Sequence, residues 1–277
     1  MIQQQFAEQA REILATDESV AGLAVAGSWL TNELDEFSDL DLVIVTKEKV
    51  APDQRKMLGY AERLGHLLSG FTGDHVGEPR LLICLYDDPL LHVDLKFVTP
   101  EEFGRRIETP ILLLDKYGQL EEALQNATSK FPYPDNQWIE DRFWTWVHYA
   151  LVKIGRGEYL EAYDFLGFLR MTVFGPLLHI KNGNLPRGVR KVETALQPAD
   201  LQQLVKTIPA YNAPSLLRSL RQAAELYRAL RDCLYGGEVQ IQKQAEIKVM
   251  SYFDTIERIS ITMDNTYKEV STQIGST

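Results

Sequence analysis

Two carboxylates stand one residue apart where a polar stretch meets an apolar run. Asp39 and Asp41 end a mostly polar stretch and lead into the run "LVIV". Residues i and i+2 of a strand point to the same face, so the two side chains would project side by side. Adjacent carboxylates repel each other unless a cation lies between them. A hard divalent ion with oxygen ligands, Mg²⁺ above all, suits this pair.

A third carboxylate interrupts another apolar run further along the chain. In "LLHVDLKFV", His92, Asp94 and Lys96 fall on one face of a strand, and apolar residues fall on the other. A carboxylate in the middle of such a strand needs a partner. The aspartate pair with its metal ion is one such partner. An ion pair with Lys96 or Arg80 is the alternative.

A Gly-Ser pair lies upstream of the two aspartates. Gly27 and Ser28 end the apolar run "LAVA", and ten residues separate them from Asp39. Glycine lets the backbone approach a ligand closely, and backbone amides at such a turn can hold phosphate oxygens. A metal ion that bridges phosphates needs this kind of cradle on its other side. The residues therefore predict a site for a phosphate compound that carries a metal ion.

The elements that must position these residues occupy the first half of the chain. Up to about Phe131, helical patterns alternate with short runs rich in Val and Ile, which are typical of buried strands. The stretch "GDHVGEP" is expected to be a loop. We expect helices over residues 3–15, 52–68 and from Thr99, and strands over residues 23–28, 41–46, 80–87, 90–99 and 110–118.

The second half has a different pattern. The stretch "FPYPDN" is the best boundary signal, and the residues beyond it follow a helical period. We expect an α+β protein in which a small mixed-sheet domain, residues 1–133, is followed by an all-helical bundle, residues 134–277. A kink or break is expected at Gly175-Pro176, and the last residues are expected to fray. The expected helices span residues 137–154, 158–180, 199–207, 213–234 and 239–264.

Composition limits the classes of function. The chain has 277 residues, a formal net charge of −10 and an isoelectric point near 5.1. A nucleic-acid-binding protein usually carries a basic stripe, and no basic run occurs here. No apolar run is long enough to cross a bilayer, and the N-terminal stretch lacks the apolar core of a secretion signal. With two distant cysteines, Cys84 and Cys233, we expect a cytoplasmic protein without a nucleic-acid or membrane partner.

These motifs together resemble a known superfamily. The "GS" of residues 27–28, the "SDLDL" of residues 38–42 and Asp94 among apolar residues resemble the signature of the nucleotidyltransferases, which have the DNA-polymerase-β-like fold. The resemblance covers about the first half of the chain. It implies ATP or another NTP as co-substrate and in-line attack of an acceptor oxygen on the α-phosphorus.

The resemblance also implies roles for single residues. Asp39 and Asp41 would be metal ligands for two Mg²⁺ ions. Asp94 would be either the third metal ligand or the base that takes the proton of the acceptor hydroxyl. Ser38 is either a nucleotide contact or an ordinary turn residue. Contacts to the triphosphate are expected from Gly27 and Ser28.

A looser resemblance extends into the second half. The segment "RFWTWVHYALVKIGRGEYLEAYDFLGFLR", followed by "GPLL" and "LPRGVRKVE", is similar to the helical domain of bacterial aminoglycoside and lincosamide adenylyltransferases. It implies that Lys153 meets the triphosphate, although a solvated helix face also explains this lysine. The residues that would face the acceptor are Trp144, Tyr149, Glu158 and Tyr163. Packing in the core is the alternative for Trp144, and a helix start is the alternative for Glu158.

The expected function is Mg²⁺-dependent transfer of a nucleoside monophosphate, AMP from ATP, to a hydroxyl of a small polar acceptor. An aminoglycoside-like antibiotic suits an acidic protein, because such acceptors are polycations. The alternatives are an adenylyltransferase that acts on a protein or on an unknown metabolite, and a nucleotide-binding module without turnover. A homodimer is compatible with the family, but no residue pattern decides the oligomeric state.

Overall fold

The chain divides into two compact units. The computed structural model describes residues 1–274, with side chains through residue 259. One unit is Met1–Phe131, and the other begins at Pro132. The hydrophobic core clusters follow this division, because none of them combines buried residues from both units. Each unit is therefore described by itself.

The first unit is built on a mixed six-stranded sheet with the order β3-β4-β5-β2-β1-β6. The β2–β5 pair is parallel, and the other neighbouring pairs are antiparallel. All six residues of β1 are buried, as expected for its uninterrupted apolar run. The strands are β1 Val20–Val25, β2 Leu40–Thr46, β3 His66–Gly73, β4 Glu78–Asp87, β5 Leu91–Val98 and β6 Ile111–Asp115.

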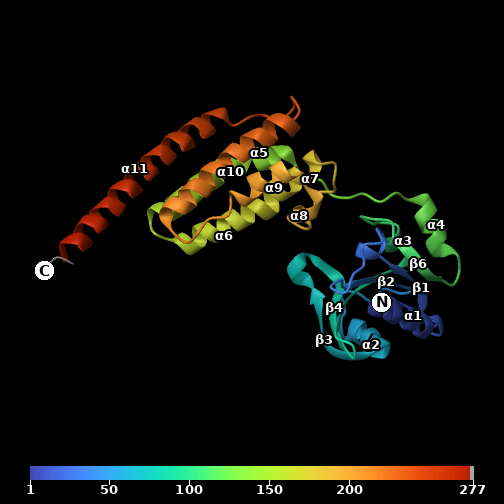
Figure 1. Cartoon of the computed structure of the whole chain (residues 1–277). Coiled ribbons are helices and arrows are strands. Elements are labelled where there is room, and N and C mark those ends of the chain that lie inside the picture. The colour runs from blue at the N-terminus through green and yellow to red at the C-terminus, as the bar shows by residue number, and fades with distance from the viewer. Residues whose placement is uncertain (275–277) are drawn as a thin grey trace. The chain divides into compact units, whose positions relative to one another are not determined.

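Helices cover both faces of this sheet. Helices α1 (Ile2–Ala15) and α2 (Gln54–Leu64) pack on one face, in one core cluster. Helices α3 (Pro100–Phe103) and α4 (Gln119–Asn126) contribute to a second cluster on the opposite face (Figure 1). The start of α3 follows from its sequence, since Thr99 and Glu102 form a capping box. The mixed-sheet fold predicted from the sequence is confirmed.

Strand β3 departs from the expected pattern. The helix predicted over residues 52–68 begins only at Gln54, after its N-cap Asp53, and ends at Leu64. Leu67 and Leu68 then lie in β3, which the leucine spacing had assigned to the helix. This strand lies at the edge of the sheet and is half exposed, so it lacks the continuous apolar run by which buried strands are recognised. Tertiary pairing with β4 decides its structure.

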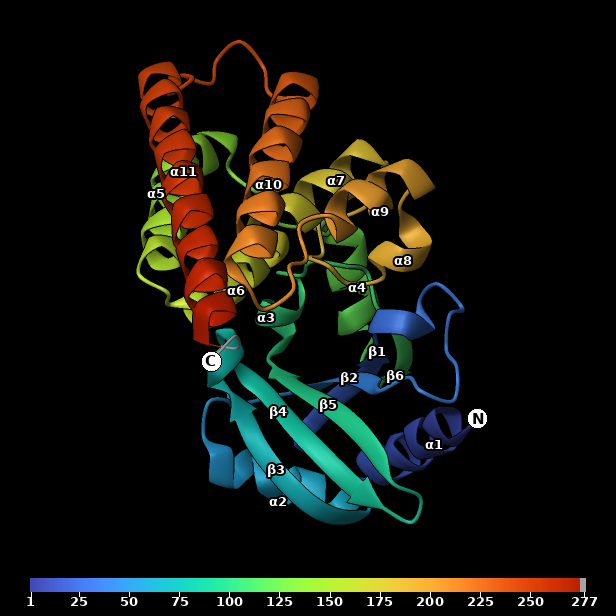
Figure 2. The ribbon, with the colours of Figure 1, turned by 60° about the vertical axis from the view of Figure 1, so that its left-hand side comes forward.

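In its described residues, the regular secondary structure of the second unit is helical. One core cluster draws on α5, α6, α7, α10 and α11. Helices α10 and α11 pack against α5 (Figure 2). The helices are α5 Asn136–Gly155, α6 Tyr159–Leu169, α7 Gly175–Lys181, α8 Val192–Ala195, α9 Pro198–Val205, α10 Ala213–Leu234 and α11 Lys243–Ile274. In the part of the chain that the structure describes, no helix is both long and apolar enough for a membrane span.

The break after α6 comes earlier than expected. A π-helical turn over Arg170–Phe174 separates α6 from α7, whereas the sequence predicted the break at Gly175-Pro176. Pro176 lies in the first turn of α7, directly after the π-helical turn, and has no N–H to donate to that turn. Gly175 packs so closely on the next loop that a Cβ would lie 2.2 Å from the Gly188 carbonyl oxygen.

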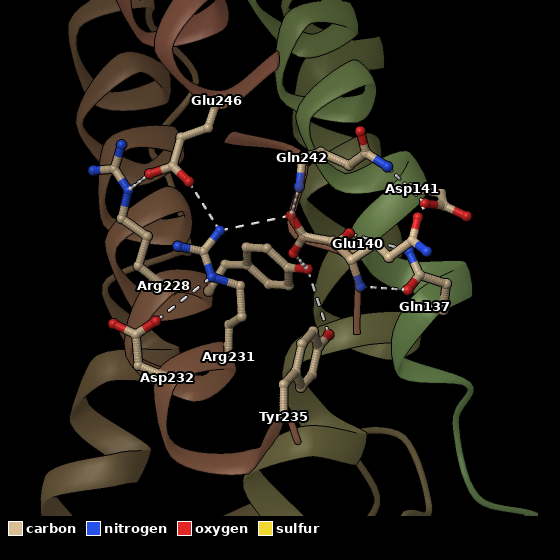
Figure 3. Close-up of polar contacts among 11 residues, drawn as sticks. Gln137, Glu140, Asp141, Arg228, Arg231, Asp232, Tyr235, Gln242 and Glu246 are labelled. Carbon is tan, nitrogen blue, oxygen red and sulfur yellow. Dashed lines mark hydrogen bonds and ion pairs between the residues drawn. The ribbon is translucent and has the colours of Figure 1, made fainter. Parts of the chain in front are cut away.

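A buried glutamate of α5 contacts two other segments of the helical unit. Glu140 of α5 is fully buried and accepts hydrogen bonds from the Tyr227 hydroxyl (2.6 Å) and the Gln242 backbone amide (2.9 Å). The Arg231 guanidinium lies 3.6 Å from the same carboxylate (Figure 3). Tyr227 and Arg231 belong to α10, and Gln242 directly precedes α11. One side chain thus connects three segments of the unit.

Candidate functional site

The parallel strands β2 and β5 bring two of the three aspartates together. Asp41 and Asp94 are partners in the β2–β5 register. Neighbouring strands lie about 4.8 Å apart, and residues in register point to the same face. Asp39 lies just before β2, two residues from Asp41. Residues some fifty positions apart in the sequence therefore meet at one place on the sheet.

A pocket opens at this place. Its volume is about 260 Å³, and all its lining residues belong to the first unit. Asp41 and Asp94 line it together with the β1 end at Ala26 and with residues that follow α3. Charged side chains of both signs surround the two aspartates: Glu78, Lys96, Glu102, Arg105, Arg106 and Glu108.

Asp94 lies in an environment that disfavours its charge. Burial raises the pKa of Asp94, His92 opposes this shift, and the negative charge of Asp39 adds to it. The opposing contact is a hydrogen bond between Asp94 Oδ1 and His92 Nε2, at 3.0 Å. A cation beside Asp94 would relieve this penalty, because an opposite charge favours the ionised form.

The alternative partners proposed for Asp94 are occupied elsewhere. Lys96 Nζ lies 2.9 Å from Glu78 Oε2, and Arg80 Nε donates to Glu78 Oε1 at 2.7 Å. The Arg80 hydrogen bond and the Lys96 contact hold the pKa of Glu78 at about 2. The interpretation of Asp94 as an ion-pair partner of Lys96 or Arg80 is therefore wrong.

Gly27 lies directly against Asp41. It begins a 3-10 turn over Gly27–Trp29 and has a positive φ of +64°. A Cβ on this residue would lie 1.9 Å from Asp41 Oδ2, so only glycine allows the carboxylate its position. The Gly27 amide donates to Glu108 Oε1 at 2.9 Å. Ser28 follows in the same turn, and its carbonyl oxygen accepts from the Glu33 amide at 3.1 Å.

Ser38 contributes to the loop that leads into the aspartates. Its hydroxyl donates to Asp35 Oδ1 at 2.8 Å and accepts from the Asp35 amide at 3.0 Å. The buried Gln3 side chain donates to the carbonyl oxygens of Asp35 (3.0 Å) and Ser38 (2.7 Å). These contacts fix the residue before Asp39. They correspond to the turn role that the sequence left open for Ser38, and its contact with a nucleotide stays a prediction.

Lys153 lies in the second unit, near the end of α5. Its Nζ contacts Glu158 Oε2 at 2.6 Å and Glu161 Oε2 at 2.9 Å. The hydrogen bond that Lys153 donates to Glu158, followed by the one that it donates to Glu161, raises the pKa of Lys153. Trp144, expected to face the acceptor, is instead 1% exposed in the helical core. The large ring fills space between helices, so the expectation for Trp144 is wrong.

The carboxylates suit a divalent metal ion by their chemistry. Asp39, Asp41 and Asp94 carry the oxygen ligands that Mg²⁺ prefers, and burial, with the charge of Asp39, raises the pKa of Asp94. No three His, Cys, Asp or Glu side chains in the described part of the chain converge on a ready-made metal centre. Asp94 is held by His92 instead. The residues fit the ion, and their closure around it stays a prediction.

Two residues of this site escaped the sequence analysis. Glu108 stands in a short, charged connection without periodicity, and only the pairing of β1 with β6 brings it to Gly27. Gln3 is a polar residue within an amphipathic helix, and the loop that it anchors lies more than thirty positions away. Neither position carries a local sequence signal for its contact.

Comparison with known proteins bears on the first unit above all. Residues 7–130 match the family model of the nucleotidyltransferase domain. An aminoglycoside 6-adenyltransferase from Bacillus subtilis is 16% identical, with 92% of this chain and 98% of that chain covered and a TM-score of 0.38. A spectinomycin adenyltransferase from Enterococcus faecialis, solved with ATP and spectinomycin, is 11% identical, with 92% and 99% covered and a TM-score of 0.33.

A third solved structure is similar over a smaller share of its length. A nucleotidyltransferase-like protein from Exiguobacterium sibiricum is 13% identical, with 83% of this chain and 75% of that chain covered and a TM-score of 0.34. No curated protein matches the chain. The part of the chain that matches the nucleotidyltransferase family model, residues 7–130, lies in the first unit and contains all three aspartates.

Proposed function

We propose that this protein is a metal-dependent nucleotidyltransferase that moves AMP from ATP to a hydroxyl of a small polar acceptor. The observation that carries the proposal is the register of Asp41 with Asp94 across the parallel strands β2 and β5. Two carboxylates that meet in a pocket of a nucleotidyltransferase domain are well suited to hold the metal ion of a nucleotide.

Each residue has a defined part in this proposal. Asp39 and Asp41 would hold Mg²⁺, with Asp94 as a third ligand or as the base, and two ions are expected by resemblance to the superfamily. When bound, Mg²⁺ neutralises phosphate charge and polarises the phosphorus that is attacked. The amides of the Gly27–Trp29 turn bind phosphate oxygens. The acceptor oxygen forms a bond to the α-phosphorus, and the bond from that phosphorus to pyrophosphate breaks.

Asp94 could act as a base or as a metal ligand, and one variant separates the two roles. As a base, it takes the proton of the acceptor hydroxyl. As a metal ligand, it only binds. Asp94→Asn should retain Mg²⁺–ATP binding and lose the transfer rate by about two orders of magnitude or more if Asp94 is the base. Loss of Mg²⁺ binding makes it a ligand.

Charge supports a cationic acceptor. Residues 1–131 contain 23 acidic and 12 basic side chains, a formal charge of −11, so the acidity of the protein is concentrated in the unit with the aspartates. A polyamine-like or aminoglycoside-like acceptor, which carries several ammonium groups, would be attracted to such a surface.

The test is a transfer assay with labelled ATP, Mg²⁺ and a panel of aminoglycosides, lincosamides, neutral polyols and candidate proteins. Pyrophosphate release with one acceptor class is expected for the wild type, and Asp39→Asn or Asp41→Asn should abolish it. Asp88→Asn is the control, because Asp88 is an exposed turn residue with a φ of +61° that asparagine also adopts. Full activity of either active-site variant would refute the metal assignment. Nucleotide binding without pyrophosphate release across the panel would favour a non-catalytic module.

A further inference from the structure

The carboxylate of Glu108 accepts a hydrogen bond from a backbone amide in the candidate site. Gly27 N donates to Glu108 Oε1 at 2.9 Å, although the two residues are 81 positions apart. The pairing of β1 with β6 brings these two residues together. Val25 at the end of β1 pairs with Ile111 at the start of the antiparallel β6, so the segment after Val25 runs beside the segment before Ile111.

The segment that carries Glu108 is anchored close by. The guanidinium of Arg106 donates to the carbonyl oxygens of Ala123 (3.3 Å) and Leu124 (2.9 Å), at the end of α4. The Arg106 carbonyl oxygen accepts from the Lys130 amide at 2.9 Å. Glu108 follows two residues later, with its backbone path constrained by Arg106 on one side and by β6 on the other.

The side chain of Glu108 lies in the pocket of Asp41 and Asp94. Its neighbours Ile107 and Thr109 are exposed, whereas Glu108 is partly buried and lines this pocket. The Gly27 amide donates to its carboxylate, and a hydrogen bond to a charged acceptor is among the stronger ones in proteins.

We propose that Glu108 is an internal competitor for the phosphate of the nucleotide. Its carboxylate takes the Gly27 amide that a phosphate oxygen requires, so binding of the nucleotide must displace it. This inference rests on the proposed function, because it assumes that the Gly27 turn receives phosphate. It makes Glu108 a residue that sets nucleotide affinity, and it predicts that the Glu108 side chain moves before or during binding.

A purely structural role predicts the opposite effect. If Glu108 only satisfies the Gly27 amide, its removal leaves a polar group without its partner, loosens the turn and weakens nucleotide binding. If Glu108 competes, its removal frees the amide and strengthens binding. The sign of the change in affinity therefore separates the two roles.

The test is calorimetric titration of the full chain with Mg²⁺–ATP, Mg²⁺–tripolyphosphate and adenosine. Glu108→Ala should bind ATP and tripolyphosphate about tenfold more tightly than the wild type, the factor that corresponds to one hydrogen bond to a charged group. Glu108→Gln keeps an oxygen acceptor without charge, so it should gain less. Adenosine, which lacks phosphates, should bind all forms alike. Glu12→Ala is the control, because Glu12 is exposed on α1 and does not line the pocket.

The outcomes are distinct. Unchanged or weaker binding of both phosphate compounds by Glu108→Ala and Glu108→Gln overturns the inference and leaves the proposed function intact. A gain for adenosine equal to that for ATP also overturns it, since the competition would not concern phosphate. A wild type that binds neither ATP nor tripolyphosphate contradicts the proposed function itself. In the transfer assay, competition by Glu108 appears as a lower KM for ATP in the variants.

Discussion

At the scale of single residues, Gly27 shows how a missing side chain sets the position of a functional one. The residue combines a left-handed φ with a Cβ direction that points at the Asp41 carboxylate. A β-carbon would therefore act twice, through backbone strain and through a collision with Asp41. The two effects can be separated because Gly77 has a φ of +77° and open space around its Cβ position.

We expect Gly27→Ala to abolish transfer and Gly77→Ala to retain it. Both variants carry the left-handed strain of about 1–2 kcal/mol, but only the first displaces the Asp41 carboxylate. Thermal denaturation should show a loss of stability for both variants, larger for Gly27→Ala because of the collision, whereas the transfer rate should fall at least about a hundredfold for Gly27→Ala alone. Equal activity of the two variants would show that the Asp41 position tolerates the added carbon.

Glu78 provides a prediction about pH. Its folded pKa of about 2 lies below the ordinary value of 4.5, because Arg80 and Lys96 stabilise the carboxylate. The stabilisation is therefore present above about pH 4.5 and is lost as the pH falls toward 2. For this partly exposed group we expect about 1 kcal/mol at neutral pH.

The measurement is the free energy of unfolding of wild type and Glu78→Gln from about pH 7 to about pH 3. The wild type should be the more stable form at pH 7, and the difference should shrink below pH 4.5. Glu101→Gln, at an 81% exposed position, should show a much smaller difference. A difference for Glu78→Gln that does not change with pH would contradict the assigned role of its charge.

The aspartates could be selected from the sequence because the cost of burying charge leaves few explanations for carboxylates in apolar runs. Asp41 and Asp94 do meet across two strands. Glu108 could not be selected, since its contact with Gly27 depends on how two distant segments pair. Contacts of this kind follow from the register of a sheet, which a single sequence leaves open.

At the scale of elements, the helical unit depends on one buried charge. Glu140 is fully buried, and its partners come from α10 and from the segment before α11. A buried carboxylate with several hydrogen bonds leaves strong donors unsatisfied when it is removed. The neighbouring Asp141 also reaches this segment, through the Gln242 side chain at 2.9 Å, but it is exposed.

We expect Glu140→Ala to lower the free energy of unfolding of the helical unit by about 3 kcal/mol. Asp141→Ala should change it by less than about 0.5 kcal/mol, as an exposed hydrogen bond usually does. Tryptophan fluorescence can follow this unit, because Trp138, Trp144 and Trp146 lie in it and only Trp29 lies in the other. Equal losses of stability in the two variants would show that the buried position of Glu140 does not raise the cost of removing its carboxylate.

The elements that the sequence predicted well are those with a one-sided or continuous apolar pattern. Helix α10 has its expected bounds and β2 begins one residue before its expected run, whereas β1 lies three residues before the expected strand 23–28. Strand β3 was missed because an edge strand needs no apolar pattern on both faces. The π-helical turn Arg170–Phe174 was missed. It lies beside the close packing of Gly175 on the loop at Gly188, and no local sequence pattern reports such a contact.

At the scale of the whole molecule, the chain combines two units of different charge. Residues 1–131 have 23 acidic and 12 basic side chains, and residues 132–277 have 16 and 17. The formal charges are thus −11 and +1. Because each core cluster of buried residues lies within one unit, each unit has the apolar interior that independent folding requires.

This asymmetry predicts that salt stabilises the two units unequally. Repulsion among like charges destabilises the compact first unit, and ions screen that repulsion over a Debye length of about 10 Å at 0.1 M salt. The second unit has almost no net charge to screen.

Scanning calorimetry should therefore show two transitions, and raising NaCl from about 0.05 M to about 0.5 M should shift that of the first unit upward by about 3 °C or more. The transition followed by tryptophan fluorescence, which reports the helical unit, should move less. A single cooperative transition would contradict independent units, and equal shifts would show that local ion pairs, such as those of Lys153 and Arg221, outweigh net charge in setting the response.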